Sequence, residues 1–83
     1  MGMRIGIEMS LYPLTEGYIP VIQSFIDRLN GEPGITVVTN RMSTQVFGEY
    51  ELVFSTLQRE LREVFAAGGA NVLVTKFLGP LPD

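Results

Sequence analysis

An alternating run of apolar and polar residues, from Arg4 to Leu14, constrains the fold of this chain more than any other stretch. The apolar residues occupy every second position: Ile5, Ile7, Met9 and Leu11. The residues between them include a carboxylate, a hydroxyl and a phenol, on Glu8, Ser10 and Tyr12. A period of two predicts a β-strand, and its apolar face must be covered by helices. Pro13 has no N–H to offer a neighbouring strand, so we expect the strand to end there.

Two later segments repeat apolar residues at intervals of three and four, which is the spacing of one helix face. The first runs from Tyr18 to Asn30, with Thr15 as its expected N-cap and Gly31 as its expected C-cap. Its apolar stripe comprises Ile19, Ile22, Phe25, Ile26 and Leu29. The stripe of the second segment comprises Tyr50, Phe54, Leu57, Leu61, Val64 and Phe65. We expect both stripes to face the core.

Three further segments, residues 35–40, 43–47 and 71–78, have the composition of strands. We expect Gly48 to end the second of them, and residues 72–74 to be covered on both faces. The order strand, helix, strand, strand, helix, strand predicts an α+β, ferredoxin-like βαββαβ fold in one domain, residues 1–83. Its four-stranded antiparallel sheet would have the order 4-1-3-2, with both helices on one face. The polar face of the first strand would then lie on the open side of the sheet.

Composition excludes several kinds of chemistry. The chain has no Cys and no His, which removes thiolate chemistry, disulfides and the commonest general base. Its net charge of −3 is unlike that of a nucleic-acid-binding domain. Glu49 and Glu51 alone do not make a metal site, so neither a metal nor a cofactor is predicted.

The chain is rich in apolar residues for its length, with 46% hydrophobic residues and a mean hydropathy of +0.24. The longest apolar runs are too short to span a bilayer. We therefore expect a homo-oligomer, a dimer or tetramer, whose sheets pack face to face. No basic-then-apolar leader opens the sequence, so we expect a cytoplasmic protein.

Three short segments together carry a family resemblance: Ser10-Leu11-Tyr12-Pro13-Leu14, residues 42–51 (Met-Ser-Thr-Gln-Val-Phe-Gly-Glu-Tyr-Glu), and Val53-Phe54. They resemble the YkoF-like family of thiamine- and hydroxymethylpyrimidine-binding proteins, and the resemblance covers nearly the whole chain. It implies ferredoxin-like domains that form dimers or tetramers and bind thiamine or its pyrimidine precursor without catalysis. The residues that match the family motif are Ser10, Tyr12, Thr44, Gly48 and Glu49.

Six residues are the candidate ligand contacts: Glu8, Ser10, Tyr12, Asn40, Thr44 and Glu49. The hydroxyls and the amide would hydrogen-bond the pyrimidine, and the phenol ring would stack on it. A carboxylate, from Glu8 or Glu49, would balance the positive charge of thiamine. We expect the pocket beside the first and third strands, near a subunit contact.

Each candidate also has a purely structural interpretation. Glu8 could form a cross-sheet ion pair with Arg4 or Arg41 at the subunit interface, and Asn40 at a strand end most often closes a turn. The hydroxyls could serve ordinary sheet or turn hydrogen bonds, Tyr12 could be an interface aromatic, and Glu49 could favour a helix N-terminus. Gly48 is interpreted as structural.

Three functions follow from these interpretations. The first is a non-catalytic binder of thiamine or hydroxymethylpyrimidine. The alternative is a homo-oligomeric regulatory or assembly module that binds protein partners without a metabolite. The third, ranked lowest, is an enzyme that uses carboxylates alone as acid and base.

Overall fold

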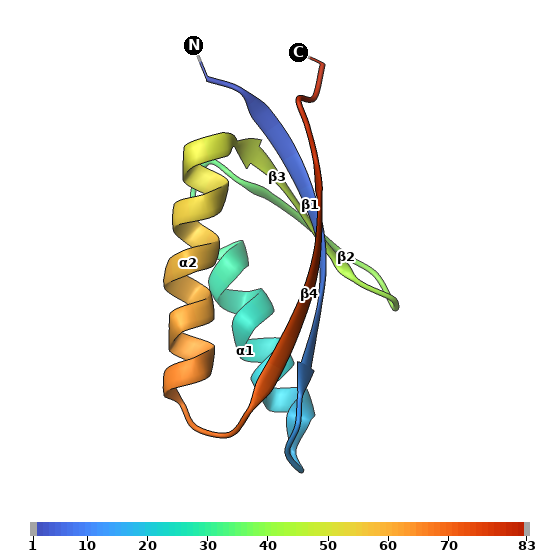
Figure 1. Ribbon diagram of the computed structural model, residues 1–83, viewed down its shortest axis with the longest axis vertical. Coiled ribbons are helices and arrows are strands. Elements are labelled where there is room, and N and C mark those ends of the chain that lie inside the picture. The colour runs from blue at the N-terminus through green and yellow to red at the C-terminus, as the bar shows by residue number, and fades with distance from the viewer. Residues whose placement is uncertain (1, 83) are drawn as a thin grey trace.

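The computed structural model describes residues 2–82, so Met1 and Asp83 of the predicted domain lie outside the described residues. Its elements are β1 (Arg4–Pro13), α1 (Tyr18–Asn30), β2 (Thr36–Thr39), β3 (Thr44–Glu49), α2 (Tyr50–Ala66) and β4 (Asn71–Leu78). The four strands form one antiparallel sheet in the order β2-β3-β1-β4, and both helices lie on the same side of it (Figure 1). The predicted ferredoxin-like fold and the strand order 4-1-3-2 are confirmed.

The apolar face of β1 forms the centre of the core, as its alternation predicts. All four of its apolar residues are buried, and they pack with residues from both helices and from β3. The other buried apolar side chains are Phe25, Leu29, Val46, Val53 and Val64.

The prediction that the apolar stripes of both helices face the core is only partly correct. On α1, Phe25 and Leu29 are buried, whereas Ile19 near the start of the helix is 65% exposed. On α2, Tyr50, Phe54 and Phe65 are exposed, and the buried face comprises Val53, Thr56, Glu60 and Val64. The buried face of α2 includes the Glu60 carboxylate because α2 packs against α1 as well as against the sheet. The Arg28 side chain of α1 binds this carboxylate, with Nε 2.9 Å from Oε1.

The predicted N-cap of α1 is wrong. Gly17 is the N-cap instead of Thr15, and its φ of 71° lies in the left-handed region that glycine adopts without strain. Gly31 is the C-cap, as expected, and its N–H donates to the carbonyls of Asp27 and Arg28.

Two expectations about strands are also corrected. Gly48 does not end its strand, because β3 continues to Glu49. A Cβ at position 48 would lie 3.2 Å from the Cγ2 atoms of both Ile35 and Val53, so a side chain there would require these neighbours to shift. Residues 72–74 are not covered on both faces, because β4 is an edge strand in which Val72 is 45% exposed and Val74 is 51% exposed.

The register of β1 leaves one side of its second half without a strand neighbour. β1 pairs with β3 only from Arg4 to Met9, whereas it pairs with β4 from Gly6 to Pro13. Residues 10–13 therefore have a strand partner on the β4 side alone. The space on their other side is bordered by α1 and by the turn between β2 and β3.

Candidate functional site

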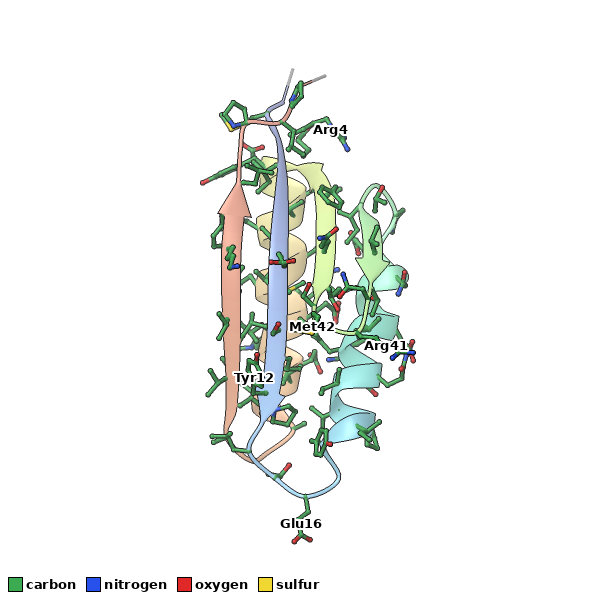
Figure 2. The ribbon with its side chains drawn as sticks, turned by 90° about the vertical axis from the view of Figure 1, so that its right-hand side faces the viewer. Arg4, Tyr12, Glu16, Arg41 and Met42 are labelled. Atoms are coloured by element: carbon green, nitrogen blue, oxygen red, sulfur yellow. The ribbon has the colours of Figure 1, made fainter. Side chains whose placement is uncertain are left out.

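A cavity of about 200 Å³ lies where β1 extends beyond the end of β3. One wall is residues 9–12 of β1, and another is the β2–β3 turn with its flanking residues 39–44. The apolar side is provided by Ile22, Phe25 and Ile26 of α1. Figure 2 shows Arg41 and Met42 on the turn and Tyr12 on the second half of β1.

Four of the six predicted ligand contacts line this cavity: Ser10, Tyr12, Asn40 and Thr44. They come from segments about thirty positions apart in the sequence, and the pairing of β1 with β3 brings them together. Thr44 is buried at the start of β3, and Tyr12 is exposed. These four residues supply two aliphatic hydroxyls, an amide and a phenol ring to a cavity that also has an apolar wall.

Asn40 closes the β2–β3 turn, which confirms the structural interpretation of this residue. Its Oδ1 accepts hydrogen bonds from the backbone N–H of Met42 at 2.8 Å and of Ser43 at 2.9 Å. Its own backbone N–H donates to the Ser43 carbonyl at 3.0 Å. Because the carbonyl oxygen of the amide serves the turn, the Nδ2 donor is the group suited to reach a ligand.

Ser10 connects the turn to the central strand. Its hydroxyl donates to the Met42 carbonyl at 3.2 Å, across the part of β1 that has no β3 partner. The ordinary turn hydrogen bond that was the alternative interpretation of Ser10 is therefore present. The hydroxyl oxygen still has lone pairs with which it can accept a hydrogen bond from a ligand.

Glu8 lies on the open face of the sheet and does not line the cavity. It borders a separate depression of about 270 Å³, together with Gln45, Phe47, Lys76 and other residues of β1 and β4. The Ser43 hydroxyl donates to Glu8 Oε2 at 3.0 Å, so Ser43 joins this carboxylate to the wall of the first cavity.

The ion-pair partner of Glu8 within the chain is Lys76, not Arg4 or Arg41. The strand register places Lys76 opposite Glu8, and Lys76 Nζ lies 3.7 Å from Glu8 Oε1. Figure 2 shows Arg4 at the other end of the molecule from the Tyr12 end of β1. Hydrogen bonds from Ser43 and Gln45 lower the pKa of the Glu8 carboxyl below its ordinary value of 4.5, with a smaller contribution from the Lys76 charge.

Replacing this carboxylate is expected to change how stability depends on pH. Because the pKa of Glu8 is lower in the folded chain than in the unfolded chain, ionised Glu8 stabilises the fold. This stabilisation is fully present above the unfolded-state pKa of about 4.5, and it is lost as the pH falls through the lower pKa of the folded chain. Glu8→Gln should therefore destabilise the chain more at neutral pH than at about pH 3, as measured by urea unfolding at both pH values.

The control for this experiment is Glu16→Gln, since Glu16 projects from the loop between β1 and α1, away from the sheet (Figure 2). It should cause the same small change at both pH values. Equal pH dependence for the two variants would contradict the role of the Ser43 and Gln45 hydrogen bonds.

Glu49 lies far along β3 from the cavity and is the N-cap residue of α2. It pairs with Arg4 in the sheet register and lines neither of the two cavities described above. Its side chain makes no capping hydrogen bond. Its carboxylate lies beside the positive end of α2, which fits the structural interpretation of this residue.

Several lining residues were not among the predicted contacts. Ile22, Phe25 and Ile26 fall on the apolar stripe of α1, and periodicity alone does not separate a cavity wall from core. Ser43 carried a signal that could have been used, because it is a hydroxyl within the family-like segment 42–51.

Among residues 2–82, no group of three or more His, Cys, Asp or Glu side chains converges in a way that could hold a metal ion. Within the same part of the chain, neither helix combines the length and apolarity needed to cross a membrane.

A family model identifies the family of this chain, and solved structures share its fold. The model of the YKOF-related family matches residues 4–77. A protein of Streptococcus pneumoniae has a crystal structure that matches with a TM-score of 0.82 and 23% identity, covering 90% of this chain and 84% of that one. A provisionally named thiamine biosynthesis/salvage protein of Thermotoga maritima matches with a TM-score of 0.80 and 19% identity, covering 92% of this chain and 83% of that one.

A hypothetical protein of Methanocaldococcus jannascii has a TM-score of 0.81 and 18% identity, covering 98% of this chain and 84% of that one. No curated protein matches the sequence. At these identities the solved structures show that the fold is shared.

Proposed function

Because this chain belongs to the YKOF-related family, we propose that it is a non-catalytic protein that binds thiamine or the hydroxymethylpyrimidine moiety of thiamine. The proposed site is the cavity between β1, α1 and the β2–β3 turn. The observation that carries the proposal is that Ser10, Tyr12, Asn40 and Thr44, chosen from the sequence as ligand contacts, line this one cavity. The name of the Thermotoga maritima structure, a thiamine biosynthesis/salvage protein, points to the same chemistry.

The polar groups of the cavity suit the pyrimidine half of thiamine. An aminopyrimidine presents ring nitrogens that accept hydrogen bonds and an amino group that donates them. The Ser10 hydroxyl, which gives its hydrogen to the Met42 carbonyl, can accept a hydrogen bond from the amino group, and the Thr44 hydroxyl can donate to a ring nitrogen. The planar ring would lie against Tyr12 on one side and the apolar side chains of α1 on the other.

The charges near the cavity favour the pyrimidine over the whole vitamin. Among the described residues that line it, Arg41 alone carries a charge, and that charge is positive. Glu8 lies on the open face and is already engaged by Ser43, Gln45 and Lys76. The thiazolium cation of thiamine would therefore find a positive charge and no carboxylate among the residues that line the cavity.

The proposal is tested by isothermal titration calorimetry with the free pyrimidine and with thiamine. We expect the pyrimidine to bind at least as tightly as thiamine, and Ser10→Ala and Thr44→Val each to weaken pyrimidine binding up to about tenfold, the value of one hydrogen bond. Ser55→Ala, a hydroxyl removed from the exposed side of α2, is the matched control and should change nothing. No heat of binding with either compound at millimolar concentration would exclude this function.

A second candidate function, an assembly module, is favoured by the apolar residues on the open face of the sheet. Exposed side chains there include Tyr12, Val38, Val72, Val74 and Leu78, on three of the four strands. We propose that this face packs against the same face of a second subunit, in a homo-oligomer that leaves the ligand cavity beside the contact. A binder and an assembled protein are compatible; an oligomer that binds neither compound would favour the assembly function alone.

A further inference from the structure

β4 is an edge strand in which the charge of Lys76 is the one feature that usually protects such an edge. It runs for eight residues, Asn71–Leu78, and pairs only with β1, so its outer side presents unpaired backbone N–H and C=O groups. Natural edge strands avoid unwanted pairing by being short, bulged, proline-containing or charged. β4 is long, contains no proline and carries one charge, on Lys76.

The side chains of β4 are apolar on both faces of the sheet. Val72, Val74 and Leu78 are exposed on the open face. On the helix face, Phe77 is 55% exposed although its ring stacks on Phe54 of α2, with ring centroids 5.2 Å apart and planes 6° from parallel. Exposed apolar side chains therefore lie on both faces of the β4 edge, and a partner that adds a strand to this edge would contact both sets.

We propose that β4 pairs antiparallel with β4 of a second copy of this chain, across a two-fold axis at Thr75, to form a continuous eight-stranded sheet. Residues directly opposite in antiparallel strands point to the same face of the sheet. The two-fold axis must therefore lie midway between one residue and the copy of that residue in the partner strand. An axis at Thr75 places Leu73 opposite Phe77 on the helix face. It places Val72 opposite Leu78 and Val74 opposite Lys76 on the open face.

The neighbouring register matches the side chains less well. An axis at Val74 would place Phe77 opposite Asn71 and Leu73 opposite Thr75, so both apolar residues of the helix face would meet polar ones. In the Thr75 register the symmetry produces two Leu73–Phe77 pairs and two Val72–Leu78 pairs. Each of these four apolar pairs would stabilise the dimer in addition to the backbone hydrogen bonds. The side chains of β4 on the helix face thus favour the Thr75 register over the Val74 register.

Symmetry also favours a second copy of β4. In this register each Lys76 lies opposite Val74, and the two lysines are diagonal neighbours on the open face, about 7–8 Å apart. Each lysine has its own Glu8 carboxylate 3.7 Å away, which offsets their repulsion. The other sheet edge is β2, which has only four residues, Thr36–Thr39. Pairing of β2 with β4 would be head-to-tail and would continue without limit unless it closed a ring, whereas pairing of β4 with itself closes as a dimer.

This interface is separate from the proposed face-to-face packing of sheets and does not depend on ligand binding. Edge pairing extends the sheet sideways, and face packing stacks one sheet on another. A substitution on the helix face of β4 should therefore disturb the edge contact alone, and one on the open face of β2 should disturb only the stacking.

The sharpest test is a disulfide across the two-fold axis, because the native chain has no Cys. In the Thr75→Cys chain the two introduced thiols would face each other, with Cα atoms about 4.5–5.5 Å apart, a separation that a disulfide can span. Mild oxidation should convert most of this variant to a covalent dimer on a non-reducing gel. Asn71→Cys is the matched control: it lies on the same face of the same strand, but its two copies would be about 26 Å apart and should not cross-link.

Sedimentation of the full chain gives an independent test. Phe77→Lys should raise the dissociation constant of the edge dimer at least tenfold, whereas Val38→Lys, on the open face of β2, should leave it unchanged. Circular dichroism would verify that each variant is folded. A folded Thr75→Cys chain that stays monomeric under oxidation, cross-linking of Asn71→Cys to the same extent, or self-association unaffected by Phe77→Lys would each overturn the proposal.

Discussion

Ile26→Trp is expected to abolish measurable binding of hydroxymethylpyrimidine, lowering its affinity by at least about 100-fold, or about 2.7 kcal/mol. Ile26 lies on α1, and its side chain lines the apolar side of the cavity. An indole at this position would occupy much of the cavity of about 200 Å³ and exclude a ring of similar size. Ile26 is only partly buried, so the substitution should not disturb the core. Calorimetry with the free pyrimidine measures the effect.

The matched control is Ile26→Val, which keeps a β-branched apolar side chain at the same place and should change the affinity little. Urea unfolding of both variants establishes that the fold is retained. Unchanged pyrimidine binding by a folded Ile26→Trp chain would show that the ligand binds elsewhere, for example in the open-face depression beside Glu8.

Leu29→Ala is expected to lower the free energy of unfolding by about 2–5 kcal/mol, the usual range for removing a buried leucine side chain. Leu29 is 1% exposed and belongs to the core between α1 and the sheet. An 83-residue chain buries a modest core, and its total stability is expected near the lower end of about 5–15 kcal/mol. The melting temperature should therefore fall by more than about 8 °C, since each kcal/mol is worth about 4–8 °C in a domain of this size.

Ile19→Ala provides the comparison, because Ile19 is on the same helix but is exposed. In a monomeric chain it should alter stability by no more than about 0.5 kcal/mol. The two residues were indistinguishable in the predicted stripe, so this pair tests the orientation of α1 directly. A loss at Ile19 as large as that at Leu29 would mean that the stripe is buried along its whole length.

The sequence predicted most clearly which face of a single strand is buried and in which order the helices and strands follow one another. The alternation in β1 predicted its buried face correctly at all four apolar positions. The change from a period of two to a period near four predicted two helices among four strands, and that order permits few compact topologies. The polar face of β1 and the family-like motif indicated Ser10, Tyr12 and Thr44, and the donor and acceptor groups of an amide indicated Asn40.

Relations between elements were harder to predict. Periodicity shows which residues share a side of a helix but not how far the helix is rotated, and α2 turns Glu60 inward because α1 offers Arg28 as its partner. In the same way, the sequence does not show which charged residue neighbours Glu8, because the register of β1 and β4 is what brings Lys76 beside it.

The amino-acid order of this chain therefore specified its strands, its helices, the core side of β1 and most of the polar residues around the cavity. All of these depend on neighbours within a few positions. The cavity itself, the ion-pair partner of Glu8 and the exposure of both faces of β4 were set when the strands aligned. They arise because β1 pairs with β3 over its first half and with β4 over most of its length, an offset between distant segments that no local pattern records.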